Sequence, residues 1–263
     1  MKKKLLIYRN CIGLGDWIMM MSLIKMLNIQ FPDIEVHLNM SAKGESVPNI
    51  IKQVAEGFDA RIDKFVDILK PEDEKGYDYK SGHLVYDRKL ERHLIEGMVK
   101  NFYENTKINL KYDPSVLSQY QPKVIPKLLL PKEYILMPSC GGQRNFLGKE
   151  WGFERFNKLA ELLSRDIAIV QTGNHSDPIL KSAGYKYLGV APWILHCLMV
   201  RSKFFIGIVN GLCHFAGHHR IRQFTIYFGR EKFEWSKYEN QTQLDGNKTP
   251  EEIYEIIKQE VLF

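Results

Sequence analysis

The sequence has little that would hold it in a membrane. No uninterrupted apolar run approaches the ~18 residues that a membrane-spanning helix needs. The basic start at Met1–Tyr8 is like that of a signal peptide, but its apolar stretch stops at Arg9, short of the ~7–15 residues of such a signal. We therefore expect these residues to form a first buried strand and the protein to stay in the cytoplasm.

The patterns of a metal-binding or disulfide-linked protein are also missing. The cysteines are far apart and form no Cys-x-x-Cys pair, which argues against a zinc site or a disulfide framework and fits a reducing compartment. No Asp-x-Asp pair occurs, so a divalent cation has no obvious pair of carboxylate ligands. We expect neither a metal ion nor a bound cofactor.

The composition is that of a folded protein with a mild basic surplus. A hydrophobic content of 44% and an aromatic content of 12% suffice for a substantial core and exclude a disordered chain. The formal net charge of +6 is shared by both halves, so neither half is a basic arm. The surplus favours an anionic partner such as a nucleotide, an acidic lipid or a nucleic acid. A solvated surface of mixed charge without such a partner would give the same net charge.

Strand-like and helix-like segments alternate along the chain. This alternation predicts parallel sheets covered by helices on both faces. The expected strands are 4–9, 35–38, 65–69, 134–138, 167–172, 204–208 and 223–228. The expected helices are 17–29, 47–56, 90–106, 153–164, 191–200, 211–217 and 250–262.

A proline-rich stretch at 107–132 interrupts the alternation. Prolines at this density block long helices and central strands, so the stretch is expected to link two domains. The predicted fold class is therefore α/β, with two Rossmann-like domains facing a cleft. The N-terminal domain would span 1–130 and the C-terminal domain 131–263.

The turn between the first strand and the first helix is one candidate site. It contains Gly13, Gly15 and Asp16, and ligands bind at the carboxyl ends of parallel strands. The dipole of the following helix favours an ionised Asp16. Asp16 could equally be a helix cap, with the glycines serving the turn. No third glycine follows at the spacing of a dinucleotide-binding fingerprint.

The second candidate site is a strand, glycine turn and helix start at Ile206–Gly217. The expected helix would present the backbone N–H groups of Gly211, Leu212 and Cys213, a geometry that suits a diphosphate. His214 lies one turn into this helix. Further along, the aromatic stretch Phe233–Tyr238 would either line a nucleotide pocket or pack as a loop.

Several segments in this order resemble the heptosyltransferase-like glycosyltransferases of family 9. In the donor motif of that family, Asn210 takes the Ser/Thr place, and Gly211, His214 and Ala216 match. The segments that carry the resemblance are Gly15–Leu27, Phe31–Leu38, Lys149–Leu163, Val170–Asn174, Leu188–Gly189, Leu195–Ser202, Asn210–Ala216 and Phe228–Gly229.

The resemblance implies a GT-B fold, a catalytic base at Asp16 and a nucleotide-sugar donor in the C-terminal domain. The acceptor would lie at the N-terminal domain, near the turn that Gly13 and Gly15 form. The residues expected to contact the donor are Ser139, Arg144, Lys149, Trp151, Gly173, Asn210, Gly211, Leu212 and His214.

Some of these residues also have a packing interpretation. Trp151 and His214 could be core residues, and Lys149 could lie on the surface. His218 and His219 are expected on the exposed side of their helix. The chain departs from the family motif at Val209, where the family has an acid, and this puts the identity of the donor sugar in doubt.

The predicted activity is an inverting, metal-independent sugar transfer to a hydroxyl acceptor. The family resemblance points to a surface saccharide such as the lipopolysaccharide core, with the protein cytoplasmic or peripheral at the inner membrane. One alternative is a phage-type enzyme that glycosylates a hydroxylated DNA base. A second is a non-catalytic sugar-nucleotide-binding protein, and a third, a sugar-nucleotide epimerase, needs further acidic and histidine groups. The sequence leaves the choice among hexosyl, heptosyl and pentosyl transfer open.

Overall fold

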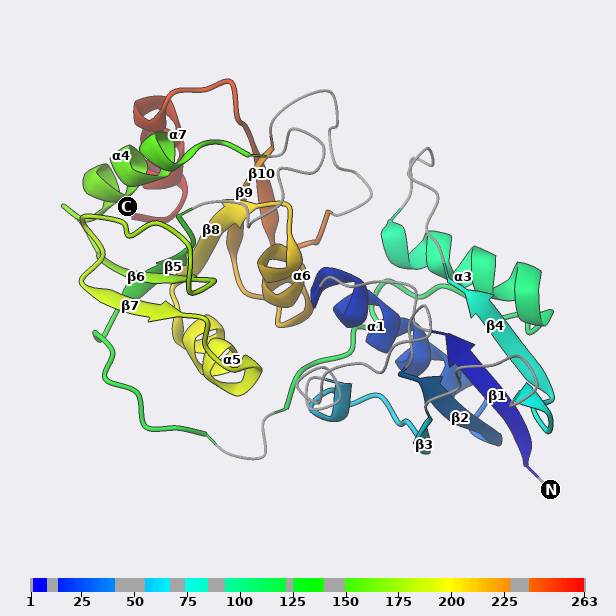
Figure 1. Cartoon of the computed structure of the whole chain (residues 1–263). Helices are drawn as coiled ribbons and strands as arrows, with labels where there is room; N and C mark the ends of the chain where they lie inside the picture. The colour runs from blue at the N-terminus through cyan, green and yellow to red at the C-terminus, as the bar shows by residue number, and fades with distance from the viewer. Residues whose placement is uncertain are drawn as a thin grey trace. The chain divides into compact units, whose positions relative to one another are not determined.

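A computed structural model of the chain describes residues 2–8, 14–40, 55–66, 74–84, 93–121, 125–139, 150–227 and 237–262. The chain divides into two compact units, Met1–Gln121 and Pro122–Phe263 (Figure 1). The expected domain boundary at 130/131 falls in the loop segment before the first strand of the second unit. Within the described segments, no helix combines the length and apolar character required to cross a membrane.

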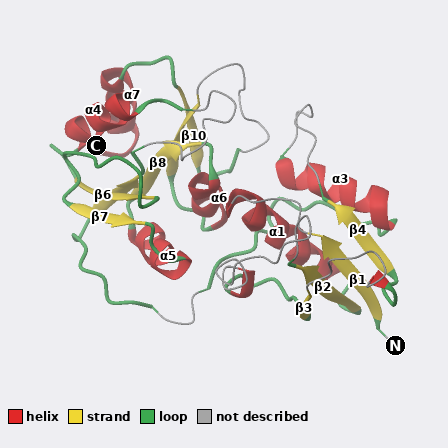
Figure 2. Ribbon diagram, in the orientation of Figure 1, coloured by secondary structure: helices red, strands yellow, loops and turns green. Residues whose placement is uncertain are grey.

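The first unit is a four-stranded sheet with two described helices (Figure 2). The strand order is β3-β2-β1-β4, and each neighbouring pair is parallel. The strands are β1 (Lys3–Tyr8), β2 (Ile34–Asn39), β3 (Lys64–Val66) and β4 (Tyr79–His83). The helices are α1 (Leu14–Gln30) and α3 (Leu94–Thr106), and α3 packs against both α1 and β4.

Helix α1 is buried along most of its length, as its apolar sequence predicts. The methionine run Met19–Met21 and the side chains around it are part of the core. A helix that is apolar on all sides must be covered on all sides, so α1 lies inside the unit rather than on its surface.

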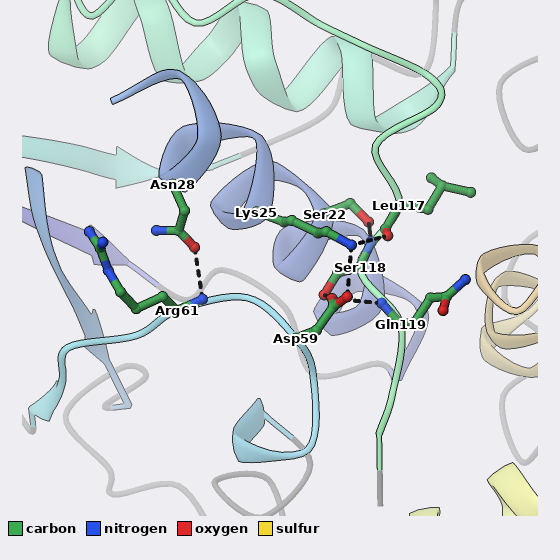
Figure 3. Close-up of polar contacts among 8 residues, drawn as sticks. All are labelled: Ser22, Lys25, Asn28, Asp59, Arg61, Leu117, Ser118 and Gln119. Atoms are coloured by element: carbon green, nitrogen blue, oxygen red, sulfur yellow. Dashed lines mark hydrogen bonds and ion pairs between the residues drawn. The ribbon is translucent and has the colours of Figure 1, made fainter. Parts of the chain in front are cut away.

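A polar cluster fastens the last segment of this unit to α1 (Figure 3). The Lys25 ammonium is 2.7 Å from a carboxylate oxygen of Asp59 and donates to the Leu117 carbonyl. The other Asp59 oxygen accepts from the Ser118 hydroxyl and the Gln119 amide, at 2.8 and 2.9 Å. The Ser118 amide donates to the Ser22 hydroxyl on α1 at 2.8 Å. The chain therefore stays attached to this unit as far as Gln119.

The second unit is a six-stranded sheet in which each neighbouring pair is again parallel. The strand order is β10-β9-β8-β5-β6-β7. The strands are β5 (Tyr134–Met137), β6 (Ala168–Gly173), β7 (Tyr185–Leu188), β8 (Phe204–Ile208), β9 (Gln223–Tyr227) and β10 (Gln241–Asp245). The helices are α4 (Phe153–Leu163), α5 (Pro192–Arg201), α6 (Gly211–His218) and α7 (Pro250–Ile257), with a π-helical turn at Lys258–Leu262.

Helices cover both faces of this sheet, as expected for parallel strands. α4 and α7 pack together on one face, and α5 and α6 lie on the other (Figure 1). α7 begins with a complete capping box, in which the Thr249 hydroxyl accepts from the Glu252 amide and the Glu252 carboxylate accepts from the Thr249 amide. The expected α/β class with two parallel Rossmann-like sheets is confirmed.

The expected elements agree with the structure except at three strands and one expected helix. β4, β7 and β10 are not among the expected strands, and each is a short strand at the edge of its sheet. The expected helix at 47–56 lies mostly outside the described residues. His218 was expected to be exposed, and this is wrong: its side chain is fully buried because α6 is covered on nearly every side from Cys213 onward.

Candidate functional site

The strand order of the second unit defines where a ligand would bind. Counted from β5, the sheet runs 3-2-1-4-5-6, so the chain reverses direction across the sheet between β5 and β8. At such a switch point the loops after the two central strands diverge and leave a crevice at their carboxyl ends. The loop after β5 begins at Pro138, and the loop after β8 begins at Val209.

Ser139 lies at this switch point. β5 pairs with β8 through Ile135 and Phe204, and the Pro138 side chain lies close to Gly207. Ser139, the residue after Pro138, therefore lies at the same edge of the sheet as Val209. Its side chain is fully buried, and its hydroxyl has no hydrogen-bond partner among the described residues. A buried hydroxyl of this kind is costly unless something pairs with it, so a polar ligand at this edge would satisfy it.

The beginning of α6 lies at the same edge, and Asn210 caps it. The Asn210 side-chain oxygen accepts from the amides of Leu212 and Cys213 at 2.9 and 3.3 Å. The Asn210 side chain therefore already engages two of the three backbone amides that were expected to bind a diphosphate. The amide of Gly211 precedes these two and is the one that the Asn210 side chain leaves unengaged. A diphosphate would accept a hydrogen bond from this amide or displace the Asn210 side chain from the other two.

His214 is buried one turn further into α6. It is 5% exposed, and its Nδ1 lies 2.8 Å from the Tyr238 hydroxyl. The two rings meet edge to face, with centroids 5.8 Å apart. The sequence left both residues with two interpretations, contact with the donor nucleotide or packing. It did not predict that they touch, because no spacing rule links positions 24 residues apart.

Gly173 ends β6, the strand next to β5. Its φ of 147° lies in the region that favours glycine, and a Cβ there would be 2.3 Å from an Asp177 carboxylate oxygen. Asp177 accepts from the Asn174 amide at 2.8 Å, and the Gly189 amide donates to the Gly173 carbonyl at 2.7 Å. These contacts shape the adjoining loops at the same end of the sheet.

Trp151 needs a correction, because its contacts are those of a core residue. It is 3% exposed, its indole N–H donates to the Gly246 carbonyl at 3.0 Å, and its ring meets Phe156 edge to face. It belongs to the same apolar cluster as Phe156, Leu159 and Ile253. The indole face is therefore used in packing, and a stacking role on a nucleotide base has no support.

The first unit has a switch point of its own, between β1 and β4. Asp16 is the third residue of α1 and partly exposed, and the neighbouring Gly15 is buried. Because α1 begins at Leu14, Asp16 lies inside the first turn rather than in the flanking cap position. Ser81 interrupts the β1–β4 ladder, because its hydroxyl accepts from the Tyr8 amide at 3.0 Å.

Three expected site residues, Gly13, Arg144 and Lys149, lie outside the described residues. Among the side chains that the structure describes, no group of three or more histidine, cysteine, aspartate or glutamate residues is placed to hold a metal ion. The described cysteines, Cys197 and Cys213, are buried and form no disulfide.

Two parallel sheets, each with a switch point between its first and fourth strands in chain order, define the GT-B class of fold.

No protein-family model and no curated protein matches the sequence. Solved structures do match, with almost complete coverage. ADP-heptose lps heptosyltransferase II from E. coli is 14% identical with a TM-score of 0.72, over 99% of this chain and 98% of that one.

Two further structures have the same fold. A glycosyl transferase of family 9 from Veillonella parvula is 14% identical with a TM-score of 0.66, over 100% of this chain and 92% of that one. A putative UDP-N-acetylglucosamine 2-epimerase from Listeria monocytogenes is 14% identical with a TM-score of 0.55, over 98% and 88%. At this identity the likeness establishes the fold, and the expected GT-B architecture is confirmed.

Proposed function

We propose that the chain is an inverting glycosyltransferase that takes its sugar from a nucleoside diphosphate sugar and needs no metal or cofactor. The observation that carries the proposal is the pair formed by the buried Ser139 hydroxyl and the Gly211 amide at one switch-point edge. A helix N-terminus with an adjacent buried donor suits the diphosphate of a nucleotide sugar. The fold is shared with an enzyme named for ADP-heptose and with one named for a UDP-sugar.

In this proposal the first unit holds the acceptor and the second unit the donor. Asp16 accepts the proton of the acceptor hydroxyl, whose oxygen forms a bond to the anomeric carbon. The bond from that carbon to the diphosphate breaks, and the nucleoside diphosphate leaves with the electron pair. One direct displacement inverts the anomeric configuration. The sequence has no Asp-x-Asp pair, so the negative charge of the leaving group would be met by backbone amides and cationic side chains.

The acceptor we propose is a hydroxyl of a bacterial surface saccharide. Transfer to a hydroxylated base in DNA is the competing outcome, and weak duplex binding with steep salt dependence would identify it. An epimerase is favoured less, because the fold match to an enzyme with that name has the lower TM-score, 0.55 against 0.72. A non-catalytic sugar-nucleotide-binding protein would bind the donor without turnover.

The test separates donor binding from transfer. Thermal unfolding is measured with ADP, UDP and their sugars, because a ligand at about 100 times its Kd stabilises the folded state by about 2.7 kcal/mol. Asp16→Asn should keep this shift and lose transfer, whereas Asp33→Asn, a carboxylate change at an exposed turn of the same unit, should keep both. Product configuration is read by NMR, and EDTA should leave transfer unchanged. No shift with any nucleotide would overturn the proposal.

A further inference from the structure

An exposed histidine lies flat on a glycine at one end of the second sheet. A Cβ on Gly189 would be 2.1, 2.3 and 2.5 Å from Cδ2, Nε2 and Cγ of His175. Three bonded ring atoms at nearly equal distances mean that the face of the imidazole, and not its edge, lies over the Cα of Gly189. The φ of Gly189 is 61°, which favours glycine, and any side chain there would push the ring away. Because His175 is an exposed residue, the side of the ring that faces away from Gly189 is open to solvent.

The turn that carries His175 is held by the protein itself. The Asn174 amide donates to the Asp177 carboxylate at 2.8 Å, and the Asp177 amide donates back to the Asn174 carbonyl at 3.1 Å. Asp177 is 7% exposed, so it anchors the turn on the interior. The Gly189 amide donates to the Gly173 carbonyl at 2.7 Å and joins the loops that follow β6 and β7. Since the ring and its support are in place without a ligand, stacking on this ring costs little further conformational entropy.

The strand order puts this ring two strands away from the switch-point edge. β6 pairs with β5, and β7 pairs with β6 on its other side (Figure 1). Ser139 follows β5, whereas Gly173 ends β6 and Gly189 follows β7. In nucleotide-binding Rossmann units the phosphates lie at the end of the first strand and the ribose at the end of the second. The base then extends toward the third strand, across two strand spacings of about 10 Å in total. His175 and Gly189 lie at that place.

We infer that the imidazole of His175 is the platform on which the base of the donor nucleotide stacks. Histidine is one of the side chains on which bases stack, and such stacking tolerates any base because every base has a π-face. The ring therefore fixes the position of the nucleoside and leaves the identity of the base to other contacts. This role rests on the proposed function, because it needs a nucleoside diphosphate whose phosphates lie at the switch-point edge.

The first test is the affinity for ADP and UDP, measured by calorimetry. His175→Ala removes the ring and should weaken binding about five- to a hundredfold, the range for one stacked base. His175→Phe restores an aromatic face and should recover most of that loss. Tyr185→Ala is the matched control, because it removes a half-exposed aromatic ring at the amino end of β7, and it should leave the affinity unchanged.

The second test is an NMR readout that a purely structural role of His175 would not move. The Cδ2–H and Cε1–H signals of His175 are assigned by their loss in His175→Ala. They should shift upfield when the nucleotide binds, because a base stacked on the imidazole shields these protons. Inorganic pyrophosphate has no base and should leave both signals in place.

The outcomes separate this role of His175 from the proposed function. If a nucleotide binds the wild type and His175→Ala equally, or binds without shifting the His175 signals, the inference is overturned and the proposed function stands. A His175→Phe protein that binds no better than His175→Ala also overturns it. If neither ADP nor UDP binds the wild type, both proposals fail. Base stacking on His175 without any sugar transfer would overturn the proposed function alone.

Discussion

Lys25 and Asp59 form an ion pair of 2.7 Å. Both side chains also hydrogen-bond to the segment Leu117–Gln119 near the end of the first unit. Burial alone would raise the pKa of the Asp59 carboxyl. The Lys25 ammonium, the Ser118 hydroxyl and the Gln119 amide outweigh that effect and lower the pKa below its usual value. The carboxylate is therefore charged in the folded state and accepts three contacts, from Lys25, Ser118 and Gln119.

Replacing Asp59 by Asn should destabilise the first unit by about 1–2 kcal/mol. Hydrogen bonds to charged groups contribute about 1.5–3 kcal/mol, and partial exposure of this pair reduces that figure. Glu104→Gln is the matched control, because Lys100 and Glu104 form an exposed pair at 4.0 Å that should contribute almost nothing. Urea unfolding measures both variants. Equal midpoints for the two would show that the Asp59 cluster adds no stability.

His93 makes stability depend on pH. Its side chain accepts from the Ile95 amide as the cap of α3, and burial lowers its pKa to about 4. Between the unfolded pKa of about 6.5 and the folded value, the unfolded chain takes up a proton that the folded chain does not. His93 therefore costs no stability above pH ~6.5. As the pH falls toward 4, the free energy of unfolding decreases by up to about 3 kcal/mol.

The measurement for His93 is urea unfolding at several pH values between 4.5 and 7.5. His93→Asn keeps a capping side chain without an ionisable group, so its stability should fall less steeply with acid than that of the wild type. A His93→Asn protein with the wild-type slope would assign the pH dependence to other groups.

Asn210→Asp should move stability and nucleotide affinity in opposite directions. The carboxylate keeps both cap bonds to Leu212 and Cys213, and its charge interacts favourably with the N-terminus of α6, worth about 0.3–1 kcal/mol. The same charge repels a diphosphate at that helix end, so ADP affinity should drop at least tenfold. Asn157→Asp adds the same charge on α4, where the side chain accepts from the Lys181 amide, and should leave affinity unchanged. Unchanged affinity in Asn210→Asp would remove this helix end from the donor site.

The sequence predicts the central strands well and three of the four edge strands poorly. The exception is the edge strand β3 (Lys64–Val66), which overlaps the expected strand at 65–69. β5, β8 and the Leu5–Ile7 part of β1 are buried on both faces and therefore show as continuous apolar runs. β4, β7 and β10 each lie at a sheet edge, where one side of the strand pairs with no other strand in the described part of the chain and polar residues are tolerated. Their sequences lack the apolar pattern from which strands are recognised.

For the candidate site, the sequence locates the ends of strands but not the contacts made there. Asn210 is a preferred cap residue, and that preference could have indicated that its side chain would occupy the Leu212 and Cys213 amides. Trp151 offers no such signal, because a tryptophan beside a helix start looks the same whether it packs or stacks. The contact of His214 with Tyr238 depends on where the fold places Tyr238, between β9 and β10 in the chain, relative to α6.

The strand orders have a consequence for how the protein is made. Every strand after the first in each unit pairs with a strand that precedes it in the chain. In the first unit β2 and β4 pair with β1, and β3 pairs with β2. In the second unit β6 and β8 pair with β5, β7 with β6, β9 with β8 and β10 with β9. A chain leaving the ribosome can thus add each strand to an edge that already exists. The switch-point edge with Ser139 and Asn210 forms only when β8 docks beside β5, so a nascent chain acquires its candidate ligand site only after β8 and the start of α6 have been made.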